Sequence, residues 1–194
     1  MNKKYLETIK VLDGKFYHLE YHQQRVDASL ELESFYTLQT LLINPPKEGL
    51  YRCRIVYDIN SFELEYIPYK KRNIQSLKLV NKNEIKYEKK YENRDTLNKL
   101  FLEKGTCDDV LIIKNGLLTD TSIANIALFD GSHWVTPKEP LLYGTTRARL
   151  LQARRIEEKE IRVEDIKQYK KIALMNAMID FDIIAVENIG EIIC

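Results

Sequence analysis

Three groups of residues could carry chemistry, and they follow one another between residues 90 and 147. Lys90 comes first, Asp120 second, and the run Gly144-Thr145-Thr146-Arg147 third. A lysine amine bonds to an aldehyde only when it is deprotonated, which requires a desolvated or cation-flanked position. Lys89 and Arg94 are close enough in sequence to supply such a positive field. A lysine in so charged a segment is more often an exposed surface residue, so the other groups must support this interpretation.

The second and third groups could hold the remainder of a cofactor. Asp120 is a candidate partner for a ring nitrogen that must stay protonated, which a nearby carboxylate ensures. Its alternative is a turn at 119–122, hydrogen-bonded to its own backbone. Gly144 permits close backbone approach, and Thr145 and Thr146 offer hydroxyl and N–H groups at a helix start, where an anion is favoured. A plain helix cap is the alternative there.

A further candidate lies upstream, in His22-Gln23-Gln24-Arg25. The guanidinium fork of Arg25 suits a phosphate, and His22 lies on the same face of the expected helix. The alternative is an exposed polar helix face. Taken together, an amine, a carboxylate and a phosphate seat are the fixed contacts that pyridoxal 5'-phosphate (PLP) needs in an enzyme. A PLP site is therefore the leading hypothesis, with no metal.

The composition is that of an ordinary globular protein: 194 residues, 44% hydrophobic and 30% charged, enough for one domain or two small lobes. The net charge is +1, and acidic and basic residues are mixed along the chain, so neither nucleic acid nor a membrane surface is an expected partner. The three cysteines are widely spaced and lack metal-ligand spacing, so we expect no disulfide framework and a reducing compartment. No signal peptide or membrane span is evident, and we expect a cytoplasmic protein.

The first half of the chain predicts one compact lobe. Asp13-Gly14 between apolar stretches predicts a hairpin. Residues 20–42 lack Gly and Pro and predict one or two surface helices, ended by Pro45-Pro46. Strands are expected at 51–57, 62–66 and 76–80. The first two should be antiparallel, with one face exposed to solvent.

The second half predicts a different lobe, joined to the first by the Lys/Glu-rich segment 81–92. We expect helices at 95–103 and from Thr145 or Thr146 onward. Strands are expected at 110–113, 125–129, 134–136, 172–175 and 183–186. The fold class is α/β (α+β) with mostly antiparallel sheets, in lobes 1–86 and 87–194.

These motifs together resemble the class IV aminotransferase family of PLP enzymes, over nearly the whole chain. The family's opening pattern of Glu, Gly, His-x-x-Arg and Ser is matched by Glu7, Gly14, His22, Arg25 and Ser29. Its Thr-Glu-x-x-x-x-Asn pattern resembles the segment from Thr119-Asp120 to Asn125. Its Thr-Pro to Gly-x-Thr-Arg pattern resembles residues 136–147.

Within the family the sequence is most similar to the aminodeoxychorismate lyases. Lys90-x-x-Asn93-Arg94 is like their His-Lys-Thr-Thr-Asn-Arg stretch. Asn176-Ala177-Met178 is like their Asn-Ala-Leu segment, where transaminases more often have Gly-Thr-Ala. The resemblance implies a two-lobed class IV fold, with an N-terminal α/β lobe, a barrel-like C-terminal lobe and PLP between them.

The resemblance also implies residue roles. Lys90 would be the catalytic lysine, and the cofactor-binding residues would be Arg25, Asp120, Thr145, Thr146 and Asn176. The implied reaction converts 4-amino-4-deoxychorismate to 4-aminobenzoate and pyruvate, as in folate biosynthesis. Its partners would be a small-molecule amine substrate, a second copy in a homodimer and a separate aminodeoxychorismate synthase. The alternatives are a transaminase of D-amino-acid or branched-chain type, and a catalytically weakened PLP-binding homologue.

The chain departs from the family's pattern in several places. Asp120 replaces the usual Glu, so its contact with a ring nitrogen requires a shifted ring or a water. Lys89 replaces the usual His, which leaves two adjacent lysines, although the spacing to Arg94 favours Lys90. Other members have a longer N-terminal segment, so we expect a more open site or one completed by a partner. Candidate partners for the two substrate carboxylates are Lys10, Arg54 and Arg147.

Overall fold

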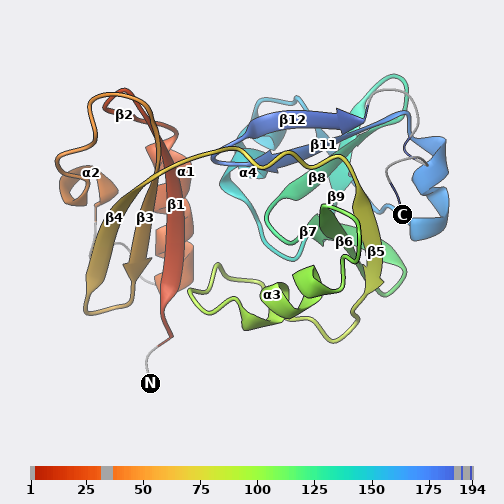
Figure 1. Cartoon of the computed structure of the whole chain (residues 1–194), viewed down its shortest axis with the longest axis horizontal. Helices are drawn as coiled ribbons and strands as arrows, with labels where there is room; N and C mark the ends of the chain where they lie inside the picture. The colour runs from red at the N-terminus through yellow and green to blue at the C-terminus, as the bar shows by residue number, and fades with distance from the viewer. Residues whose placement is uncertain (1–2, 32–36, 186–188, 190–192, 194) are drawn as a thin grey trace. The chain divides into compact units, whose positions relative to one another are not determined.

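The computed structural model describes residues 3–31, 37–185, 189 and 193, and its contacts divide into two compact units (Figure 1). The first unit comprises Met1–Lys71 and Lys89–Asn93, and the second comprises Arg72–Glu88 and Arg94–Cys194. This division and the expected lobes differ in segments 72–86 and 89–93. The predicted site residues are consequently shared: Arg25 and Lys90 belong to the first unit, and the others to the second.

The first unit is an antiparallel four-stranded sheet with one long helix. Its strand order is β2-β1-β3-β4, with β1 at Tyr5–Leu12, β2 at Lys15–Phe16, β3 at Leu50–Tyr57 and β4 at Phe62–Pro68. The predicted hairpin is confirmed, and its turn residues Asp13 and Gly14 both have positive φ (48° and 77°), as a two-residue hairpin turn requires. Helix α1 (Leu19–Leu30) and the short α2 (Leu38–Leu41) occupy part of the expected helical segment, and residues 32–36 lie outside the described ones.

The core of the first unit follows the alternation of β1. Ile9 and Val11 are fully buried and pack with Val26 of α1, whereas Thr8 and Lys10 are only partly buried. Successive side chains of a strand point to opposite faces of the sheet. Glu7 lies on the buried face, although it is charged. The sheet therefore directs one carboxylate toward the helix.

The second unit is built on an eight-stranded sheet. The order is β10-β9-β8-β7-β6-β5, and β11 pairs with both β8 and β12. The strands are β5 (Leu77–Asn81), β6 (Asp109–Lys114), β7 (Leu117–Thr121), β8 (Asn125–Phe129), β9 (Trp134–Pro137), β10 (Glu157–Lys159), β11 (Lys171–Asn176) and β12 (Asp180–Ala185). Pairing is parallel for β5–β6 and β9–β10 and antiparallel elsewhere. The helices are α3 (Asp95–Leu102), α4 (Thr145–Gln152) and the 3-10 helix η1 (Val163–Gln168).

The expected mixed α/β architecture with mostly antiparallel sheets is confirmed. Strand β7 was missed: its Thr-Asp-Thr composition is typical of a turn, but it forms the second arm of a hairpin at Asn115-Gly116. Strand β10 and helix η1 were missed as well, because both are short and charged. The strand expected at 183–186 begins earlier, as β12, and residue 186 lies outside the described ones.

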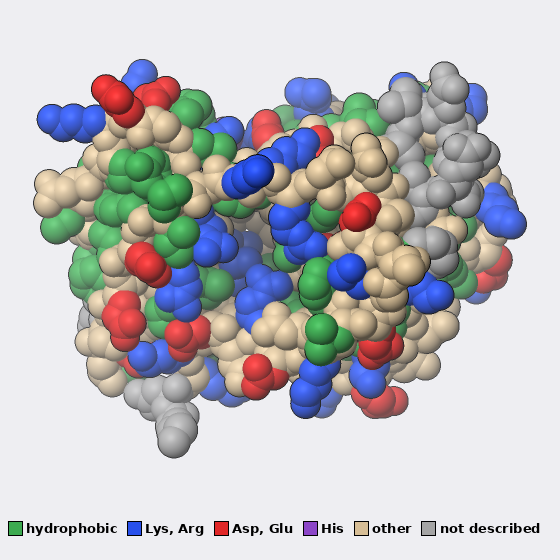
Figure 2. Space-filling model, viewed as in Figure 1, with side chains coloured by type: hydrophobic (Ala, Val, Ile, Leu, Met, Phe, Trp, Pro, Cys, Tyr) green, Lys and Arg blue, Asp and Glu red, His purple; other side chains and the backbone are tan. Residues whose placement is uncertain are grey.

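Charged side chains of both signs are spread over the face drawn in Figure 2, in line with the mixed charge of the sequence. Cys53 is a buried free thiol. Cys107 is disulfide-bonded, which is a single bridge and not the disulfide framework that the cysteine spacing argued against. Over the part of the chain that is described, no helix is long and apolar enough to cross a membrane.

Candidate active site

A buried ion pair joins β1 to α1 in the first unit. Glu7 is fully buried, and its two carboxylate oxygens accept hydrogen bonds from Nε and Nη2 of Arg25, each 2.7 Å long. Nδ1 of His22 lies 2.6 Å from Oε2 of the same carboxylate. His22 and Arg25 are three residues apart on α1, so both reach the strand from one helix face. The alternative of an exposed polar face is wrong, since His22 is buried and only 12% of the Arg25 side chain is exposed.

The protonation states of this Glu7 cluster (Glu7, His22 and Arg25) follow from its surroundings. Burial acts to raise the pKa of Glu7, but the charge and hydrogen bonds of Arg25, with the bond to His22, lower it to about 2. Burial lowers the pKa of His22, and the charges of Arg25 and Lys90 lower it further, against the opposing effect of Glu7. Glu7 is therefore ionised at neutral pH, and a neutral His22 donates its Nδ1–H to it.

The two candidate lysines are placed differently. The Nζ atom of Lys89 donates to the Ser29 carbonyl (3.1 Å) and to Oε1 of Glu31 (2.5 Å), at the C-terminal end of α1. The backbone carbonyl of Lys90 accepts a hydrogen bond from the N–H of Leu6, next to Glu7. The charge of Lys90 acts on His22. Lys90 is therefore linked to the Glu7 cluster by its backbone bond next to Glu7 and by its charge on His22. Lys89 instead binds the C-terminal end of α1.

In the second unit Asp120 is the centre of a buried hydrogen-bond ring. Oδ1 accepts from Nδ2 of Asn125 (2.8 Å), and Oδ2 accepts from the backbone N–H of Leu142 (2.9 Å). Nδ2 of Asn125 also donates to the Leu142 carbonyl (2.8 Å), which closes the ring. The ring connects β7, β8 and the loop that precedes α4. The alternative that Asp120 only bonds its own turn is therefore wrong.

The environment of Asp120 suits a cationic partner. Burial raises its pKa to about 7, and the hydrogen bonds from Asn125 and Leu142 and the charge of Arg147 offset this only in part. An N–H cation placed against such a carboxyl would favour its ionised form. A protonated pyridine nitrogen is a donor of this kind, so the residue present fits the ring of PLP.

The start of α4 is the expected phosphate seat, and its glycine has a clear steric role. Gly144 has an ordinary backbone conformation (φ −73°), so its φ does not demand glycine. A Cβ atom at this position would lie 2.0 Å from Oδ1 of Asn125, so the position requires glycine for space. Thr145 and Thr146 follow in the first turn, and both are buried. This end of the helix has the polarity that favours an anion.

Arg147 and Asn176 are held by local contacts. Nη2 of Arg147 donates to the Pro137 carbonyl (2.8 Å) and to Oε1 of Glu158 (2.7 Å), and Arg147 is only 3% exposed. This arrangement favours a structural role for Arg147 over the expected contact with a substrate carboxylate.

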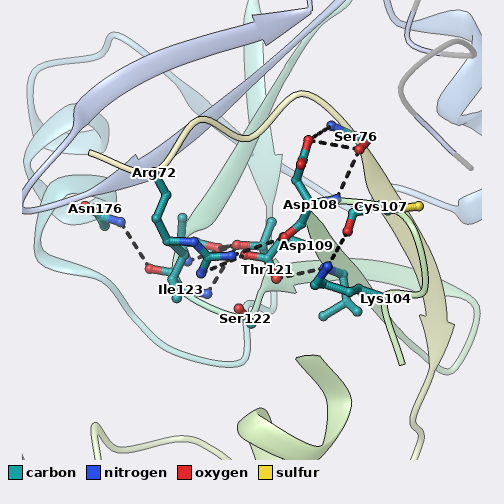
Figure 3. A network of polar contacts seen from close by, with 12 residues as sticks. Arg72, Ser76, Lys104, Cys107, Asp108, Asp109, Thr121, Ser122, Ile123 and Asn176 are labelled. Carbon is teal, nitrogen blue, oxygen red and sulfur yellow. Dashed lines mark hydrogen bonds and ion pairs between the residues drawn. The ribbon is translucent and has the colours of Figure 1, made fainter. Parts of the chain in front are cut away.

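Asn176 ends β11, and its Nδ2 donates to the Ile123 carbonyl (Figure 3). Its Oδ1 accepts from the N–H groups of Met178 and Ile179. Nη2 of Arg94 donates to the carbonyl of Ser122, in the same β7–β8 connection that Asn176 contacts. Asn176 and Arg94 therefore both fasten the turn that follows Asp120.

The structure brings the predicted residues into two groups, each within its own unit. In the first unit, Arg25 belongs to the Glu7 cluster, and the charge of Lys90 acts on His22 of that cluster. In the second unit, Asn125 bonds to Asp120 and lies against Gly144, which precedes Thr145 and Thr146, and Asn176 bonds to the turn after Asp120. Sequence reasoning gave no role to Glu7 or Asn125. Both occur in the motifs that carried the family resemblance, which was the available signal.

Comparisons with known proteins show which family the chain belongs to. The model of the amino-transferase class IV family matches residues 55–188. An uncharacterized protein of Haemophilus influenzae is 37% identical over 180 residues, which cover 89% of this chain and 96% of that protein. A crystal structure from Haemophilus somnus 129PT, provisionally named a 4-amino-4-deoxychorismate lyase, is 35% identical, with a TM-score of 0.81 over 92% of this chain and 97% of that one.

The fold is shared more widely. A hypothetical aminotransferase of Mycobacterium tuberculosis in its PLP-bound form is 14% identical, with a TM-score of 0.79 over 97% of this chain and 84% of that one. By the family match and by these relatives, the chain belongs to the class IV aminotransferase family, a family of PLP-dependent enzymes.

Proposed function

We propose that this enzyme is a PLP-dependent lyase that converts 4-amino-4-deoxychorismate to 4-aminobenzoate and pyruvate. The observation that carries the proposal is the 35% identity, over nearly the full length of both chains, to the Haemophilus somnus protein provisionally given that name. Asn176-Ala177-Met178, which resembles the lyase segment, supports the same choice over a transaminase.

The proposed cofactor-binding residues have the chemistry that PLP needs. Asp120 would accept the N–H of the protonated ring nitrogen and gain a counter-charge for its buried carboxylate. Arg25 would bind the phosphate, with its guanidinium orientation fixed by Glu7. Thr145 and Thr146 would offer hydroxyl and N–H groups to the same phosphate, and Asn176 is proposed to complete the site.

Lys90 is the proposed catalytic residue. PLP, when bound, supplies an aldehyde for the substrate amine and an electron sink for the bonds that break. The Nζ atom of Lys90 would hold the cofactor and be released when the substrate amine takes its place. Free Nζ would then remove the proton from the substrate ring and deliver a proton to the departing enolpyruvate, which becomes pyruvate. Asp120 would remain ionised and keep the ring nitrogen protonated.

The proposed substrate carries two carboxylates, and one face of the first sheet carries three cations. Lys10 of β1 lies directly opposite Arg52 of β3, and Arg54 is two residues further along the same face. Like charges directly opposite each other destabilise a strand pair. Among the described residues, the carboxylate of Glu92 lies 3.4 Å from Arg54, and the Nζ atom of Lys10 lies over the ring of Tyr17. We propose Lys10 and Arg54 as carboxylate partners, with Arg52 beside them.

The reaction is tested by supplying chorismate and glutamine together with an aminodeoxychorismate synthase. The proposal predicts formation of 4-aminobenzoate and pyruvate in equal amounts, which Lys90→Ala abolishes and Lys89→Ala preserves. Transfer of an amine from an amino acid to 2-oxoglutarate, with no 4-aminobenzoate formed, would instead identify a transaminase. PLP binding with neither reaction would identify a catalytically weakened homologue.

We also propose that the protein is a homodimer, the oligomeric state that is typical of the family it resembles. Light scattering coupled to gel filtration measures this directly. A mass of about twice the 22.9 kDa of one chain is expected, and a monomeric mass at the concentration of the assay would contradict it.

A further inference from the structure

The side chain of Asn125 contacts both of the cofactor elements that the second unit supplies. Asn125 is the first residue of β8 and is buried. Its amide nitrogen bonds to the carboxylate of Asp120, and its amide oxygen lies against Gly144, which precedes the first turn of α4. We propose that Asn125 is a positioning residue that fixes Asp120 relative to the N-terminus of α4. This inference rests on the proposed function, because it assigns Asp120 to the ring nitrogen and α4 to the phosphate.

The amide nitrogen of Asn125 is fully used. An amide has two N–H donors; one goes to Oδ1 of Asp120 and the other to the Leu142 carbonyl, both at 2.8 Å. The N–H of Leu142 returns a hydrogen bond to Oδ2 of Asp120. Asp120 of β7, Asn125 of β8 and Leu142 of the loop before α4 thereby fix one another's orientation. A shift of Asn125 would break two of the three bonds of this ring.

The amide oxygen fixes the other end of the arrangement by contact. Because a Cβ at Gly144 would lie 2.0 Å from Oδ1 of Asn125, the helix start and the amide are packed as closely as glycine allows. The carbonyl of Gly144 accepts from the N–H of Ala148, in the first turn of α4. A displaced Asn125 oxygen would therefore change the packing against Gly144 and the position of the first turn of α4.

An amide is chemically suited to this position. It donates to Asp120 without bringing a positive charge, so the carboxylate keeps its charge for the ring nitrogen. A lysine or arginine would neutralise Asp120 and compete with the cofactor, and an aspartate would repel it. A hydrophobic residue of similar size would leave a buried carboxylate oxygen and the Leu142 carbonyl without these donors, which is unfavourable for buried polar groups.

The test compares binding of PLP with binding of pyridoxal, which lacks the phosphate, by visible absorbance of the purified protein. Asn125→Ala is expected to weaken PLP binding by roughly tenfold or more, the scale seen in metal sites when the hydrogen-bond partner of a ligand residue is lost. Pyridoxal binding should weaken less, because PLP alone gains from a correct distance between the ring and phosphate seats. The preference for PLP over pyridoxal therefore falls. Asn98→Ala, on the exposed face of α3, is the matched control and should leave both constants unchanged.

Two outcomes would overturn the proposal. One is unchanged affinity for both ligands in Asn125→Ala. The other is an equal loss for both with a matching fall in the thermal midpoint, which would mark a merely structural role. Borohydride reduction at saturating PLP should still label Lys90 in this variant; absence of PLP binding in the unmodified protein would instead refute the proposed function.

A second pair of variants addresses the packing contact. Gly144→Ala is expected to weaken PLP binding, because the new methyl group displaces the Asn125 amide. In the double variant Asn125→Ala/Gly144→Ala the clash is absent, so adding Gly144→Ala should cost little beyond Asn125→Ala alone. If the loss of PLP affinity in the double variant equals the sum of the losses in the two single variants, the two residues do not share a contact.

Discussion

Glu7 and Arg25 meet through two hydrogen bonds of 2.7 Å, one to each carboxylate oxygen, within the first unit. The carboxylate is fully buried, and the guanidinium nearly so. Removing one partner of a buried pair leaves the other charge uncompensated, which costs about 3–5 kcal/mol. Glu7→Gln should therefore lower the free energy of unfolding in urea by that order. Glu20→Gln, an exposed residue of α1, should change it little. Equal effects of the two substitutions would contradict a stabilising pair.

The same pair predicts how stability responds to acid. The pKa of Glu7 is lowered from 4.5 to about 2 in the folded protein. The stability that comes from its ionised form is therefore present above pH 4.5 and lost as the pH falls toward about 2. The difference in unfolding free energy between the unmodified protein and Glu7→Gln should shrink across this window. A difference that stays constant with pH would show that Glu7 is not ionised at a lowered pKa.

Asp120 predicts the opposite dependence in the cofactor-free protein. Its pKa is raised from 3.8 to about 7, so between these values the folded protein holds a proton that the unfolded chain has lost. The contribution to stability is present below pH 3.8 and is lost as the pH rises through about 7. The unfolding free energy of the unmodified protein, relative to that of Asp120→Asn, should fall across this range and level off above it. A relative free energy that rises with pH would contradict the raised pKa.

The departure of Asp120 from the family's glutamate can be tested by restoring the longer side chain. Both oxygens of Asp120 already accept hydrogen bonds of 2.8–2.9 Å in a buried site, so a side chain longer by one methylene would displace these partners. Asp120→Glu is expected to destabilise the protein by about 1–3 kcal/mol, the usual cost of overpacking. Thermal and urea unfolding of the cofactor-free proteins provide the measurement. A variant as stable as the unmodified protein would show that the pocket admits either acid.

Much of the fold could be predicted from the sequence, because its signals are local. The Asp13-Gly14 dipeptide located one hairpin, whose two turn residues have positive φ, and alternating polarity located β3 and β4. Strand β7 escaped because its Thr-Asp-Thr composition favours a turn until a partner strand supplies hydrogen bonds. The parallel pairing of β5 with β6 joins residues 32 positions apart, such as Leu77 and Asp109, which no local pattern encodes.

The residues of the candidate site also fall into those that the sequence could identify and those that it could not. Side chains with distinctive chemistry, such as Lys90 and Asp120, could be selected from their types and order. Their supporting partners could not, because the bonds of Glu7 to Arg25 and of Asn125 to Leu142 span 18 and 17 residues and depend on how the strands pair. The burial that makes Asp120 a weak acid is likewise a property of the packed unit.

The central claim is that Lys90, not Lys89, carries the cofactor. The direct measurement is to load the protein with PLP, reduce it with borohydride, digest it and locate the phosphopyridoxyl group by mass spectrometry. The label is expected on Lys90 in the unmodified protein and in Lys89→Ala, and it should be absent in Lys90→Ala. A label on Lys89, or one that persists in Lys90→Ala, would contradict the assignment.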